Sequence, residues 1–213
     1  MKIKEKDFVE IEYTAKVKDT EIIFDLTDEA LAKKLEIHQS GAIYGSRIIC
    51  IGRDHILPVL EKALVDKEEN SSFSINLTPD QAFGKKIPAL IRTISTDILL
   101  KQKIDPYPGL QIYIAGRAGT IRSVSRGRTM VDFNHPLAGR NVTYDLKILT
   151  IIKESEQKLR GLVKTLLGIK DYELEKKEKE FLLKSKKKIP VQIQKDFIKE
   201  VAETIPEIKV NFA

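Results

Sequence analysis

The sequence holds a single cysteine and no tryptophan among its 213 residues. A disulfide needs two cysteines, so Cys50 excludes an intrachain disulfide and predicts a reducing, cytoplasmic location. No apolar run approaches the roughly 20 residues that a bilayer span needs, and no membrane partner is expected. The first residues, 1–7, show none of the apolar character of a secretory signal, so no signal peptide is predicted.

The familiar catalytic and metal-binding constellations are also missing. There is no glycine-rich phosphate loop, no nucleophile elbow and no His/Cys metal spacing. The three histidines, His38, His55 and His135, are scattered along the chain, and isolated histidines usually have structural roles. If the protein is an enzyme, its reaction should need neither a nucleophile, nor a metal, nor a cofactor.

The composition that is present indicates a folded, water-soluble chain. Apolar residues make up 42% and charged residues 32%, and the length suggests one or two domains. Residues 85–131 carry nine Lys or Arg against two Asp, a balance of +7, although the whole chain carries only +6. This contrast predicts a middle segment with its own surface and its own partners.

Hydrophobic periodicity predicts a mixture of strands and helices. We expect strands at 8–17, 21–24, 72–77, 110–115, 119–124, 128–133, 141–149 and 208–212. We expect helices at 29–35, 55–64, 159–167 and 197–205. The apolar run Ile98-Leu99-Leu100 is counted among the strands of the middle segment, and the charged stretch 172–185 fits either a strand pair or a helix.

Six short motifs occur in the order seen in FKBP-type peptidyl-prolyl cis/trans isomerases. They are Glu12-Tyr13-Thr14, Phe24-Asp25, Ile51-Gly52, the helix 56–64, Asp80-Gln81-Ala82-Phe83-Gly84 and Asn134-His135-Pro136-Leu137-Ala138-Gly139. The last motif, followed by Asn141-Val142-Thr143-Tyr144, resembles the SlyD-like subclass in particular. The resemblance covers about residues 7–152.

The resemblance implies an α+β fold with an FKBP-like antiparallel sheet wrapped on one helix. This isomerase domain would comprise residues 1–84 and 135–153, with a small β-rich insert-in-flap chaperone domain at 85–134. Residues 154–213 form a small α+β domain that resembles the extra C-terminal domain of long archaeal FKBPs, and self-association as a homodimer or client binding is its expected role. Its predicted independence implies that a chain ended after Lys153 still folds.

The resemblance also implies the functional residues. The catalytic residues would be Tyr13, Asp25 and Phe83. The substrate-binding residues would be Phe24, Ile49, Ile56, Leu57, Leu60, Leu137 and Tyr144, with the backbone N–H of Leu57 donating to a substrate carbonyl. In the structural alternative the apolar residues are simply core, and Asp25 is an N-cap. Three positions depart from the usual pattern: Phe83 replaces tyrosine, Val59 replaces glycine and Gln81 replaces an aromatic residue.

Prolyl isomerisation fits a chain without nucleophile or metal, because no bond is broken. Its barrier of about 18–20 kcal/mol comes from amide resonance. The twisted amide is less dipolar than the planar one, so a dry apolar pocket favours the twisted state. The expected partners are therefore unfolded or nascent polypeptides that contain proline. No metal is expected either, because the chain lacks the His-rich tail of many bacterial SlyD proteins.

Two other functions remain open. The first is a nucleic-acid or ribosome-associated module, supported by the basic middle segment and by Tyr107 and Tyr113 as stacking groups. Against it, lysine-rich runs also suit a solvated surface. The second is a chaperone whose isomerase pocket has decayed, suggested by Phe83 and Val59.

Overall fold

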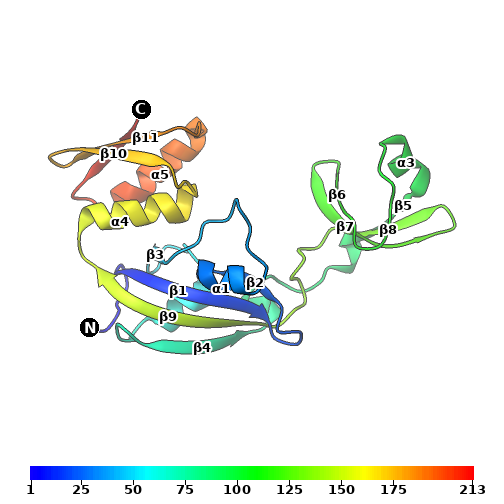
Figure 1. Cartoon of the computed structure of the whole chain (residues 1–213), viewed down its shortest axis with the longest axis horizontal. Helices are drawn as coiled ribbons and strands as arrows, with labels where there is room; N and C mark the ends of the chain where they lie inside the picture. The colour runs from blue at the N-terminus through cyan, green and yellow to red at the C-terminus, as the bar shows by residue number, and fades with distance from the viewer. The chain divides into compact units, whose positions relative to one another are not determined.

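The computed structural model describes residues 1–213 as two compact units (Figure 1). One unit comprises Met1–Leu77 and Val142–Ala213, and the other comprises Thr78–Asn141. Sheets that are almost wholly antiparallel combine with short helices, which confirms the predicted α+β class. None of the helices combines the length and the apolar character that crossing a membrane requires.

A five-stranded antiparallel sheet forms the N-terminal part of the first unit. Its strands are β1 (Phe8–Val17), β2 (Ile23–Leu26), β3 (Arg47–Cys50), β4 (Ser72–Leu77) and β9 (Val142–Ile152). The order is β2-β1-β9-β4, with β3 also paired to β1. The alternation in β1 buries Ile11, Ala15 and Val17 and leaves the side chains between them partly accessible, so the pattern that predicted this strand also orients it.

Two short helices accompany this sheet, α1 (Glu29–Lys34) and α2 (Pro58–Leu64). Leu60 and Leu64 of α2 are buried. The predicted helix 55–64 therefore begins three residues late, at Pro58. Pro58 occupies the first turn, where its missing N–H has no intrahelical partner.

The C-terminal residues of the same unit form a three-stranded sheet together with α-helices and a π-helix (Figure 1). The elements are α4 (Ser155–Leu162), the π-helix η3 (Val163–Leu167), β10 (Tyr172–Lys177), β11 (Glu180–Ser185), α5 (Val191–Thr204) and β12 (Lys209–Phe212). The stretch 172–185, which the sequence left open, is a strand pair. Gly168 ends the helical segment in the left-handed conformation, at φ +61°, as its position predicted.

One hydrophobic core joins these C-terminal elements to the N-terminal sheet. Phe8, Cys50 and Ile152 pack in the same cluster as residues of α4 and α5, such as Leu159 and Phe197. Helix α4 also approaches β3 closely, because a Cβ at Gly161 would lie 2.3 Å from Cβ of Ile48. The shared core argues against the expectation that a chain ended after Lys153 still folds.

The second unit has a four-stranded sheet of order β5-β8-β7-β6. Its elements are η1 (Pro79–Gln81), η2 (Pro88–Leu90), β5 (Ile91–Ser95), α3 (Thr96–Lys101), β6 (Gln111–Ile114), β7 (Arg117–Ser125) and β8 (Arg128–Asp132). The assignment of Ile98-Leu99-Leu100 to a strand is wrong, because these residues form α3. Helical geometry turns only Leu99 into the small core of Ile112, Ile121 and Val131.

Candidate functional site

A tyrosine and a carboxylate meet on two neighbouring strands of the first unit. The hydroxyl of Tyr13 on β1 donates a hydrogen bond of 2.9 Å to Oδ2 of Asp25 on β2. Strand register explains the pairing, because Ala15 of β1 lies opposite Asp25 on one side and opposite Tyr144 of β9 on the other. The sheet thus aligns three of the predicted site residues.

Two further aromatic rings, those of Phe24 and Tyr144, form a cluster with the ring of Tyr13. The ring of Tyr144 lies 5.9 Å from that of Tyr13 in a tilted arrangement and 6.0 Å from that of Phe24 edge to face. Both geometries are favourable for aromatic side chains. Burial, reinforced by the charge of Asp25, raises the pKa of Tyr144 to about 12. The same two causes raise the pKa of Tyr13, so both hydroxyls stay protonated and available as donors at neutral pH.

The alternative role of Asp25 as a helix cap is wrong. Helix α1 is capped by Asp28, whose Oδ1 accepts from the N–H of Leu31 at 3.0 Å. Asp25 lies within β2 and is exposed. Its carboxylate therefore does not cap α1 and instead accepts the hydrogen bond from the Tyr13 hydroxyl.

A buried carboxylate organises the loop that precedes α2. Glu61 is 3% exposed. Its two oxygens accept hydrogen bonds of 2.7–3.3 Å from five consecutive backbone N–H groups, those of Gly52, Arg53, Asp54, His55 and Ile56. The next N–H, that of Leu57, donates to no protein acceptor. The loop therefore presents an unpaired backbone donor at Leu57, the residue at which the resemblance predicts one.

Sequence reasoning missed Glu61. The available signal was a single acidic residue, followed by Lys62, in a helical segment whose other residues at 58–64 are apolar. Among the predicted substrate-binding residues, Ile49 and Leu60 are buried, so they also fit the alternative that these apolar residues belong to the hydrophobic core. Ile56 and Leu57 are half-buried.

Two predicted site residues lie in the other compact unit, where both contact His135. The ring of Phe83 stacks on that of His135, with centroids 4.7 Å apart and planes 2° from parallel. The N–H of Leu137 donates to Nδ1 of His135 at 3.2 Å. His135, which the sequence indicated as an isolated structural histidine, thus contacts two residues of the predicted site.

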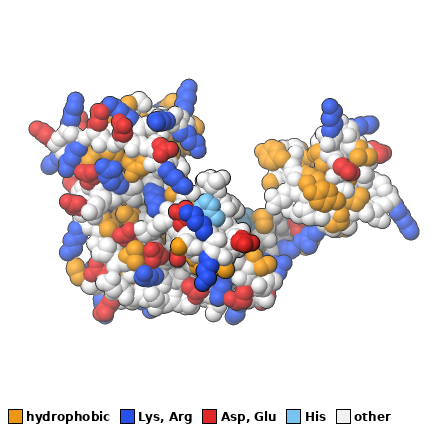
Figure 2. Space-filling model, viewed as in Figure 1, with side chains coloured by type: hydrophobic (Ala, Val, Ile, Leu, Met, Phe, Trp, Pro, Cys, Tyr) orange, Lys and Arg blue, Asp and Glu red, His pale blue; other side chains and the backbone are white.

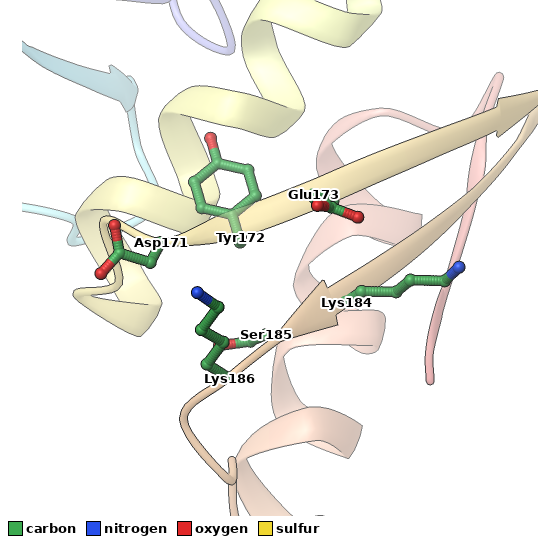
Figure 3. A pocket seen from close by; sticks show the side chains of 6 residues that line it. All are labelled: Asp171, Tyr172, Glu173, Lys184, Ser185 and Lys186. Carbon is green, nitrogen blue, oxygen red and sulfur yellow. The ribbon is translucent and has the colours of Figure 1, made fainter.

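A cavity of about 450 Å³ lies against β10 and β11 and includes none of these residues (Figure 3). It is lined by Asp171, Tyr172, Glu173, Lys184, Ser185 and Lys186. Lys184 points away from Tyr172 (Figure 3) and forms an ion pair with Glu175. This mixture of exposed charges contains no nucleophile paired with a base, so it offers no catalytic arrangement.

Comparisons with known proteins agree with the motifs. Residues 96–137 match the family model described as "FKBP26, IF domain". The FKBP-type isomerase SlyD of Treponema pallidum is 29% identical over 171 residues, 76% of this chain and 86% of that protein. A short-type peptidyl-prolyl cis-trans isomerase of Methanocaldococcus jannaschii is 25% identical over 146 residues, 68% of this chain and 92% of that protein.

A shorter match is the FKBP-type 16 kDa isomerase of Escherichia coli K12, 31% identical over 96 residues, 43% of this chain and 64% of that protein. This chain is therefore similar, over most of its length, to proteins named FKBP-type peptidyl-prolyl cis-trans isomerase and SlyD. The resemblance that the six motifs predicted is thereby confirmed.

Proposed function

We propose that this protein is a peptidyl-prolyl cis/trans isomerase and folding chaperone that acts on X-Pro bonds of unfolded or nascent polypeptides. The observation that carries the proposal is the Tyr13–Asp25 hydrogen bond beside the aromatic cluster. The relatives named as isomerases support the same activity. Cys50 is the single cysteine, so no intrachain disulfide can form, which suits a reducing cytoplasm.

The proposed mechanism uses each of these groups on a substrate prolyl amide. The rings of Tyr13, Phe24 and Tyr144 receive the proline ring, and the low-polarity surface favours the twisted amide over the planar one. The N–H of Leu57 holds a carbonyl of the peptide backbone. The carboxylate of Asp25, oriented by Tyr13, interacts with the amide as its conjugation is lost.

A protease-free assay with an X-Pro tetrapeptide tests the activity. The protein should accelerate cis/trans equilibration, which without catalyst takes roughly tens to hundreds of seconds. If the protein does not shorten the relaxation time of the tetrapeptide, a chaperone with a decayed isomerase pocket becomes the better explanation.

Phe83→Tyr restores the hydroxyl that the family pattern usually carries. We expect kcat/KM for the tetrapeptide to rise about two- to tenfold, the range of one added hydrogen bond. The melting temperature should stay unchanged, because a tyrosine ring preserves the stacking on His135. Phe83→Leu, which removes the ring, is the matched control and should lower activity. A fall in activity in the Phe83→Tyr variant would show that the pocket is adapted to phenylalanine.

The second unit offers apolar surface for unfolded clients. Figure 2 shows apolar side chains gathered on this unit. The exposed ones include Ile98, Leu100, Tyr107, Tyr113 and Met130, with Tyr113 71% exposed. Several large exposed apolar groups on so small a unit favour protein binding.

Replacing residues 85–134 by a short flap should separate the two activities. Proline-limited refolding of a whole protein should slow about tenfold or more, because capture of unfolded chain raises the effective concentration of the substrate. Tetrapeptide isomerisation should change little, because a tetrapeptide needs no such capture. The two rates are measured on the same preparations. Equal losses in both assays would contradict a chaperone role for the insert.

Salt discriminates client capture from nucleic-acid binding. Apolar capture should survive about 0.5 M salt, whereas binding to phosphates falls steeply through counterion release. Tight RNA binding that collapses with salt, together with normal refolding after the replacement, would favour the nucleic-acid module.

We also propose that the C-terminal residues mediate a homodimer. Val191, Ile193 and Ile198 of α5 are exposed, at 65%, 45% and 37%. A sedimentation coefficient that rises with protein concentration would support this association.

A further inference from the structure

Helix α5 is joined to the loop that precedes α2 by charge-assisted hydrogen bonds from Arg53. Arg53 donates from Nε to one oxygen of Glu200 at 2.8 Å and from a terminal nitrogen to the other at 2.6 Å. The same terminal nitrogen reaches Glu203. Two-point pairing of this kind fixes direction as well as distance. The loop Arg53–Leu57, called here the substrate loop, is therefore held from outside by the C-terminal part of the chain.

A second contact joins the same helix to the substrate loop. The side chain of His55 is 3% exposed. Its Nδ1 accepts from the N–H of Cys50 at 3.1 Å, which leaves the proton on Nε2, 3.2 Å from Glu200. Burial alone would raise the pKa of Glu200, but the hydrogen bonds from Arg53 and His55 outweigh it and lower that pKa. Glu200 is therefore ionised at neutral pH.

The substrate loop needs such restraints because its backbone is not intrinsically favoured. Asp54 has a positive φ of +56°, which L-residues adopt at a cost. Glu61 accepts hydrogen bonds from the backbone N–H groups of the loop. Glu200 forms hydrogen bonds with the side chains of Arg53 and His55. Together they leave the N–H of Leu57 as the free donor.

We propose that Glu200 is a positioning residue for the substrate: through Arg53 and His55 it fixes the substrate loop so that the N–H of Leu57 can bind a peptide carbonyl. The inference rests on the proposed isomerase function. It gives the C-terminal part of the chain a direct effect on substrate binding that is separate from any self-association.

The test compares Glu200→Ala with Glu207→Gln in the full chain. Glu207 accepts a hydrogen bond from the Ser155 hydroxyl and bonds no residue of the substrate loop, so its variant should retain wild-type constants. Glu200→Ala should raise KM for the tetrapeptide about tenfold, the effect of one lost charge-assisted hydrogen bond. The value of kcat should stay within about twofold, because binding rather than the twisted state is affected. Glu200→Gln, which keeps an acceptor oxygen, should recover part of the loss.

A double-mutant cycle links the effect to the free donor. Leu57→Pro removes the N–H at a residue whose φ of −53° suits proline, and Leu57→Ala controls for the lost side chain. If Glu200 acts through this N–H, Glu200→Ala should add little in the Leu57→Pro background and its full effect in the Leu57→Ala background. Additive effects in both backgrounds would overturn the proposal.

Amide hydrogen exchange gives a readout that does not depend on activity. Exchange at residues 53–57 should accelerate about tenfold in Glu200→Ala and not in Glu207→Gln, with unchanged exchange in β1 and β9. Wild-type exchange in the loop of Glu200→Ala overturns the positioning role even if the protein is an active isomerase. Faster exchange in a protein without isomerase activity keeps the restraint on the loop but removes its substrate role, together with the proposed function.

Discussion

Replacing Asp25 by alanine lowers kcat/KM for an X-Pro peptide by about one to two orders of magnitude, on the scale of a lost transition-state contact. Two losses combine. The carboxylate that we propose to face the twisted amide disappears, and the Tyr13 hydroxyl loses the acceptor to which it donates at 2.9 Å. Stability should change little, because Asp25 is exposed. The measurement is the relaxation rate of the tetrapeptide assay.

Asp28→Ala is the matched control for this experiment. It removes a carboxylate three residues away that caps α1. This change should lower the free energy of unfolding by about 1 kcal/mol, the usual value of an N-cap, and should leave kcat/KM unchanged. An Asp25→Ala variant as active as the wild type would remove Asp25 from the mechanism.

A chain that ends after Lys153 is expected not to fold cooperatively. The truncation exposes Phe8, Cys50 and Ile152, which pack against α4 and α5. Burying a large apolar side chain stabilises by about 1.5–3 kcal/mol, and the combined loss is comparable with the roughly 5–15 kcal/mol that holds a domain together. Arg53 and His55 also lose Glu200. Circular dichroism on heating should show no sharp transition in the fragment.

A glycine substitution tests the packing of α4 against β3 in the full chain, and a second glycine serves as its control. A Cβ at Gly161 would press on Ile48, whereas a Cβ at Gly41 would meet nothing within 4 Å. Gly161→Ala should therefore lower the free energy of unfolding by about 1–3 kcal/mol, and Gly41→Ala should have little effect. A soluble fragment 1–153 with a wild-type melting temperature would show that residues 1–153 fold without the C-terminal elements and would contradict this expectation.

The sequence predicted those features that depend on local pattern. The alternation in 8–17 and 72–77 gave the strands β1 and β4 with their bounds, and the six motifs led to the FKBP-type relatives. Tyr13, Asp25, Phe24 and Tyr144, which the resemblance assigns to one site, lie close together in the structure, and their role in catalysis stays a prediction. The placement of Phe83 and Leu137 against these residues stays a prediction.

Features that depend on distant partners were missed. The helix at 55–64 begins late because the N–H groups before it bond Glu61 instead of forming a helical turn. The run 98–100 is a helix rather than a strand, because only Leu99 has a core to reach. Nothing in the separate patterns of 1–50 and 154–213 indicates that Phe8 and Phe197 share one core. Such contacts depend on tertiary packing that local periodicity does not encode.

The pairing of Leu77 with Val142 at the ends of β4 and β9 bears on how the chain tolerates its long insertion. The 64 residues of Thr78–Asn141 begin and end beside each other, so they form a closed loop in the host sheet. For flexible chain, closing such a loop instead of a four-residue turn costs only about 2.5 kcal/mol, since closure entropy grows with the logarithm of length. A hydrogen bond of 2.8 Å from the N–H of Gly139 to the carbonyl of Gly84 already draws the two ends of the insertion together. An insertion whose own fold brings its ends together lowers this entropic cost of loop closure further. Its length and sequence are therefore free to vary while the host sheet keeps its register.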